Sequence, residues 1–92
     1  MTLLEKCKKA LRIRHSQLDE MILEDIDTAR LEMRRAGVVS EVANSDNKLV
    51  EMAICAYVQM KEGNDEKKEL YEEAWKLQLD DIRKSGQLPE EE

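Results

Sequence analysis

The sequence is poor in the residues that make turns and aromatic cores. Its 92 residues include three glycines, one proline, one tryptophan, two tyrosines and no phenylalanine. Strands favour aromatic residues, and the turns between them need glycine and proline, so the composition disfavours an all-β fold. Because 39% of the chain is charged and 41% is apolar, we expect a helical protein with one modest core rather than a disordered chain.

Long apolar runs and paired cysteines are also absent. No run approaches the roughly 20 residues of a membrane span, and we expect no signal peptide, because the start lacks the apolar region of one. The two cysteines, Cys7 and Cys55, lie far apart and form no CxxC pair. No disulfide framework is indicated, so we expect a reducing cytoplasm, with Cys55 as a small core residue.

Basic residues are in the minority. The chain has 21 acidic and 15 basic residues, and its net charge is −6. Binding to a phosphate backbone needs a basic surface, and a recognition helix needs exposed basic and amide residues. We therefore expect neither specific nucleic-acid binding nor contact with an acidic membrane, and the charge itself favours solubility.

Apolar residues recur at helical spacing along most of the chain. The most apolar stretch, 49–60, would be apolar nearly all round a helix, which is typical of a buried central helix. We predict helices in four ranges, at about residues 2–12, 16–36, 46–62 and 65–84. The loop at 38–45 separates the second from the third, and Val42 and Ala43 add a half turn to it.

The predicted helix ends carry recognisable capping residues. Thr2 and Glu5 have the spacing of a capping box, and Ser16 and Asp65 are suited to begin the second and last helices. Three glycines follow the last three helices: Gly37, Gly63 and Gly86.

The predicted fold class is all-α. We expect a small four-helix domain over residues 1–86, made of a short N-terminal helix and three longer helices, with the apolar helix at 46–62 in the centre. The acidic end, residues 87–92, is expected to be a flexible tail.

Residues able to carry chemistry do not form a catalytic or metal-binding pattern. His15 and Cys7 could form a nucleophile–base pair, but no orienting group or oxyanion hole is indicated, so we favour a capping role for His15. Four carboxylates crowd the start of the second helix: Glu20, Glu24, Asp25 and Asp27. Metal sites in helical bundles add a Glu-x-x-His pair, which is missing. We predict a solvated acidic face, no enzyme activity, no metal and no cofactor.

Several apolar residues fall outside the core stripes of the four helices. Such residues indicate a second buried surface, and therefore a partner or self-association. The candidate assembly surface has six members: Leu23, Leu31, Val38, Val39, Leu79 and Leu88. Two of them, Val38 and Val39, are also expected to pack against the core.

The whole pattern over residues 3–86 resembles the tailed-phage head–tail connector family, small proteins of DNA packaging and head completion. The N-terminal part carries the resemblance most specifically, through these residues: Leu3-Leu4-Glu5-Lys6, Lys8-Lys9-Ala10-Leu11-Arg12-Ile13, His15, Leu18-Asp19, Ile22, Ile26, Ala29 and Ala36-Gly37-Val38. The central stretch is similar to the family's Ala-Ile-x-x-Tyr-Val motif, at Ala53-Ile54 and Tyr57-Val58. The last helix matches more loosely, at Leu70-Tyr71-Glu72 and from Leu79 to Ser85-Gly86.

The resemblance implies a structural role in a phage or prophage virion. Family members form rings of about twelve subunits beneath the portal protein, join it to a head-completion (stopper) or tail protein, and let DNA pass through the ring. Before assembly such a subunit would lie in the bacterial host cytoplasm. The family implies no catalytic residues. An acidic subunit also suits a channel that must not grip DNA.

Two other functions are compatible with a small helical domain. The first is a prophage-encoded regulatory or adaptor module that binds a host protein. The second is a DNA-binding regulator, which would retard duplex DNA in a salt-dependent way.

Overall fold

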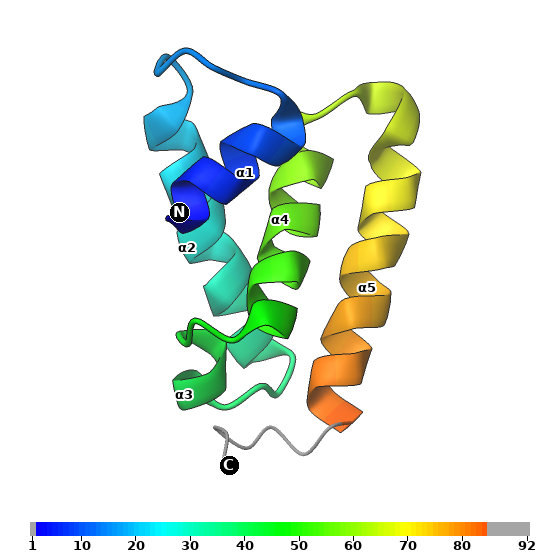
Figure 1. Cartoon of the computed structure of the whole chain (residues 1–92). Coiled ribbons are helices and arrows are strands. Elements are labelled where there is room, and N and C mark those ends of the chain that lie inside the picture. The colour runs from blue at the N-terminus through cyan, green and yellow to red at the C-terminus, as the bar shows by residue number, and fades with distance from the viewer. Residues whose placement is uncertain (1, 85–92) are drawn as a thin grey trace.

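The computed structural model describes residues 2–84, and these fold as an all-α domain, which confirms the predicted fold class (Figure 1). The element order is α1 (Leu3–Leu11), α2 (Asp19–Arg35), α3 (Ser40–Ala43), α4 (Lys48–Glu62), the 3₁₀ turn η1 (Asp65–Lys67) and α5 (Lys68–Lys84). The additional helix, α3, lies where a half turn was predicted. The predicted tail, 87–92, lies outside the described residues.

Helix α4 is the centre of the domain. It lies between α2 and α5, and α1 crosses over α2 and α4 (Figure 1). Six of its residues are buried: Val50, Ala53, Ile54, Ala56, Tyr57 and Val58. The prediction that α4 is buried nearly all round is wrong at its N-terminal end, where Leu49 and Met52 are 50% and 56% exposed. The surrounding helices are too few to cover this edge.

Helix α5 packs along α4 through aromatic and aliphatic side chains. The rings of Tyr57 and Trp75 meet edge to face with their centroids 4.9 Å apart, a favoured aromatic geometry. Ile82 is buried further along α5. This contact holds the last helix against the central one.

Capping geometry explains where the first two helices begin and end. The Thr2–Glu5 capping box is present, which confirms the prediction for α1. Ser16 does not cap α2, because this helix begins at Asp19 and its N-cap, Leu18, makes no side-chain bond. At the other end of α2, Gly37 has the predicted left-handed conformation, with φ = 106°. The amide of Val38 donates to the Met33 carbonyl at 2.9 Å, as in a Schellman motif.

Asparagines cap the later helices. Asn47 accepts a hydrogen bond from the Leu49 amide at the start of α4, and Asn64 accepts one from the Glu66 amide ahead of α5. The observed cap, Asn64, therefore lies one residue before the predicted cap, Asp65. Gly63 ends α4 as predicted, but in an extended conformation. A Cβ at this position would lie 2.4 Å from the Gln59 carbonyl oxygen, so only glycine fits without a shift.

Truncation of a buried side chain in the central helix should destabilise the domain. Ile54 is 0% exposed, so Ile54→Ala removes buried methyl groups and should lower the free energy of unfolding by about 2–5 kcal/mol. Leu77→Ala is the matched control, because Leu77 is 63% exposed and the change should cost less than about 0.5 kcal/mol. Urea denaturation measures both, and equal losses would contradict the central placement of α4.

Candidate functional site

The only histidine and the first cysteine have separate environments. Cys7 is fully buried, whereas His15 is exposed in the loop between α1 and α2, where its Nδ1 accepts the Gln17 amide at 3.3 Å. The structure instead brings Cys7 beside Cys55, with 3.6 Å between the two Sγ atoms. This contact joins α1 to α4 across 48 positions of sequence, so no local pattern could have indicated it.

Of the four carboxylates singled out near the start of α2, three are solvated. Glu20, Glu24 and Asp27 are exposed, but Asp25 is half-buried and its Oδ2 lies out of contact with solvent. Burial raises the pKa of Asp25 to about 7, and its hydrogen bond with the neighbouring Glu62 carboxyl adds to the shift. Two carboxyl groups can form that bond only when one of them holds a proton.

The acidic pair lacks the partners that a catalytic or metal site needs. Within residues 2–84, no group of three or more histidine, cysteine or acidic side chains could hold a metal ion. Asp25 and Glu62 line none of four hollows on the described surface. We therefore treat this pair as a determinant of stability rather than of chemistry.

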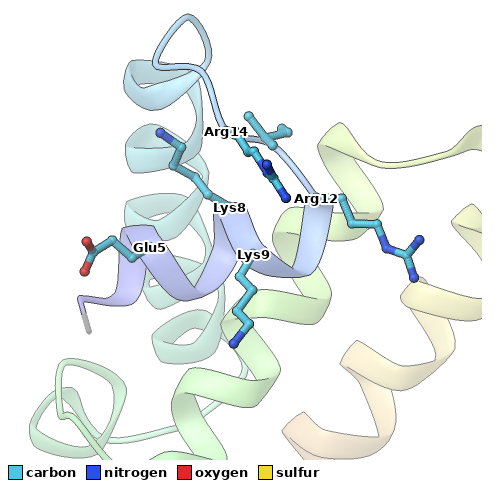
Figure 2. Close-up of a pocket in the computed structure, with 6 residues that line it drawn as sticks. Glu5, Lys8, Lys9, Arg12 and Arg14 are labelled. Atoms are coloured by element: carbon cyan, nitrogen blue, oxygen red, sulfur yellow. The ribbon is translucent and has the colours of Figure 1, made fainter.

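The basic face of α1 borders a hollow of about 510 Å³, shown in Figure 2. Lys8 is engaged by Asp19, with 2.8 Å between Nζ and Oδ1. Lys9 and Arg12 diverge from each other in Figure 2 rather than pointing at one centre, and Glu5 places a carboxylate at the same hollow. Anion binding needs converging donors, so this arrangement does not form an anion site.

A groove between α4 and α5 is a largely apolar hollow of the surface. Its volume is about 590 Å³. We call it the α4–α5 groove, and its apolar lining comes from both helices: Met52, Cys55, Ala56, Leu70, Tyr71 and Ala74. An ion pair between Lys6 and Glu51 lies at its edge. An apolar hollow with a charged rim is typical of a surface that binds another protein.

Three large apolar side chains of α4 and α5 are exposed to solvent. Two of them, Met52 and Leu70, line this groove. Leu70 and Leu77 are 60% and 63% exposed on α5, and their spacing of seven residues places them on one face of the helix. Met52 is 56% exposed on α4. Exposed apolar side chains that gather beside an apolar groove are typical of surfaces that bind another protein.

The predicted assembly residues divide into four groups. Leu23 and Leu31 are each 46% exposed on α2, and Val39 is 44% exposed after it. Val38 is 2% exposed and belongs to the core, so its place in the assembly surface is wrong: the turn at Gly37 directs it inward. Leu79 is half-buried against the core. Leu88 lies outside the described residues.

The two exposed apolar areas lie on different helices. Leu23 and Leu31 define what we call the α2 surface, and α2 flanks α4 on the side opposite α5 (Figure 1). Sequence reasoning missed the groove residues Met52 and Leu70, because their helical spacing matches that of core residues.

In the described part of the chain, no helix has the length and apolarity to cross a membrane.

The stability of the domain should depend on pH through Asp25. Its pKa is raised to about 7, so its stabilising contribution is complete below the unfolded value and is lost as the pH rises through about 7. Lys61 opposes the shift and Glu24 adds to it. At about pH 9, Asp25→Asn should therefore be more stable than the natural chain by about 1 kcal/mol, a value discounted for solvent screening.

Asp27→Asn is the control for this measurement, because Asp27 is exposed on the same helix. Urea denaturation between about pH 5 and about pH 9 gives the free energy of unfolding of the three chains. The free energy of unfolding should depend less steeply on pH in Asp25→Asn than in the other two chains. An identical slope in all three chains would show that Asp25 titrates as an ordinary carboxyl.

Comparison with known proteins finds no match to this chain among family models, curated proteins or solved structures. The connector resemblance noted in the sequence therefore stays a prediction.

Proposed function

We propose that this protein is a head–tail connector subunit of a tailed phage or prophage, a structural protein without enzymatic activity. Its copies would form a ring under the portal protein, join it to a head-completion or tail protein, and leave a channel for DNA. The family resemblance, which runs through α1, α2 and α4, supports this identity. The observation that carries the proposal is a pair of separate apolar surfaces, one on α2 and one between α4 and α5.

Two different surfaces on one subunit suit a head-to-tail contact. When unlike surfaces of identical subunits meet, each subunit leaves one surface free for the next, and the chain of contacts closes into a ring if the rotation allows. In this arrangement the α4–α5 groove of one copy receives the α2 surface of its neighbour. Leu31 and Met52, both exposed in the single chain, would then be removed from water.

The charge of the subunit also agrees with this role. A net charge of −6 repels the phosphate backbone, so a ring of such subunits would let DNA pass without holding it. The same charge weighs against a regulator that binds duplex DNA.

Substitutions in the two surfaces should disrupt assembly separately. Met52→Glu places a charge in the groove and Leu31→Glu places one on the α2 surface, so each should weaken self-association about tenfold or more. Gln17→Glu is the control, because it adds the same charge at an exposed loop position. Sedimentation at high concentration, alone and with portal rings as a template, measures association, and thermal unfolding shows that each variant folds.

A mixture of the two variants makes this test specific. One intact groove and one intact α2 surface remain between them, so the mixture should form dimers but no larger ring. If neither variant weakens association, or if the mixture recovers no dimers, the head-to-tail contact is wrong. A chain that neither self-associates nor binds portal rings, but is bound by one host protein through the groove, would instead be a prophage adaptor module.

Gene order provides an independent test of the proposed identity. Structural genes of a virion are expected to lie together, so the genes directly upstream should encode a portal protein, a protease and a capsid protein. Sequencing of the flanking DNA decides this. A neighbourhood of host regulatory genes would contradict the connector function.

A further inference from the structure

The contact between Cys7 and Cys55 places two thiols where they can react with each other. Their Sγ atoms are 3.6 Å apart, and α1 crosses α4 in this part of the molecule (Figure 1). A disulfide needs about 2.05 Å between the sulfurs, so rotations of the two side chains must close a gap of about 1.5 Å. Both cysteines are free.

We propose that Cys7 and Cys55 form a peroxide-sensitive dithiol site, in which Cys55 is oxidised first and Cys7 then closes an intramolecular disulfide between α1 and α4. This inference does not depend on the proposed function. It needs only the fold of the single chain and a peroxide as oxidant.

The two thiols differ in access. Cys55 is half-buried and lines the α4–α5 groove, so a small peroxide can reach its sulfur. Cys7 is 0% exposed and can be reached only through its neighbour. The order of reaction follows from this difference, because the accessible sulfur must meet the oxidant first.

The two thiols also differ in acidity. The hydrogen bond with Cys7 lowers the pKa of Cys55, and Lys6 acts in the same direction, while burial and Glu51 oppose the shift. The same hydrogen bond and burial raise the pKa of Cys7. Because the thiolate is the nucleophile, Cys55 is also the more reactive of the two.

The chemistry balances with hydrogen peroxide as the only added reactant. The Cys55 thiolate attacks one peroxide oxygen and the O–O bond breaks, which gives Cys55 sulfenic acid and hydroxide. The Cys7 sulfur then attacks the Cys55 sulfur, the S–O bond breaks, and the hydroxyl leaves as water with the Cys7 proton. In total, two thiols and one peroxide yield one disulfide and two waters.

A disulfide fits this site better than a bound metal ion. Among the described residues, no third histidine, cysteine or acidic side chain joins the two sulfurs to form a metal-binding group. The disulfide would link positions 48 residues apart and so restrict the unfolded chain considerably. A small thiol would reverse it by exchange.

The experiment uses the folded, full-length chain treated with dilute hydrogen peroxide. Intact-mass measurement should show the loss of two hydrogen atoms without added oxygen, and peptide mapping should identify a bond between Cys7 and Cys55. The midpoint of thermal unfolding should rise by about 10 °C or more, and a reducing agent should restore it.

Two variants separate the roles of the sulfurs. In Cys7→Ala, Cys55 should stop at the sulfenic acid, which dimedone traps as a stable adduct. In Cys55→Ser, the buried Cys7 should be oxidised about tenfold or more slowly than Cys55 is in the natural chain. Thermal unfolding confirms that both variants are folded.

Three results would overturn the proposal. The natural chain could remain reduced at peroxide levels that oxidise an exposed model thiol, or it could form only disulfides between two copies. Cys55 could also be oxidised to the sulfinic acid without any bond to Cys7. Measurement on the natural chain decides between these results and the proposed one, whether or not the variants are stable.

Discussion

The side chains of Val50, Ile54 and Val58 are removed from water only because other helices pack around α4. This burial is the main source of apolar stabilisation in a chain of 92 residues. Helices α1, α2 and α5 each contribute side chains to the same core. Their positions relative to one another are therefore set by α4.

Three neighbouring helices do not cover every apolar side chain that α4 and α5 carry. Met52, Leu70 and Leu77 stay more than half exposed, although the rings of Tyr57 and Trp75 pack α5 against α4. The uncovered area is what a small helical domain offers to a partner, because burying it would gain free energy only on association. The proposed ring uses this area together with the α2 surface.

Two pairs of titratable groups lie at the contacts that α4 makes with its neighbours. Cys7 of α1 lies against Cys55 of α4, and Asp25 of α2 lies against Glu62 at the end of α4. Each pair acquires its properties from contact between helices: the pKa values of the thiols are shifted by a shared hydrogen bond, and the pKa of Asp25 is raised mainly by burial. Neither property belongs to one residue alone.

The sequence by itself determined the helices and several of their ends, because helical periodicity, capping boxes and glycine stops act within a few residues. The Thr2–Glu5 box and the left-handed Gly37 follow from such local rules. Only the tertiary structure decided that Val38 is buried while Val39 stays exposed, and that Cys55 and Asp25 face partners on other helices. These outcomes depend on how helices pack, and packing joins residues that lie far apart in the chain.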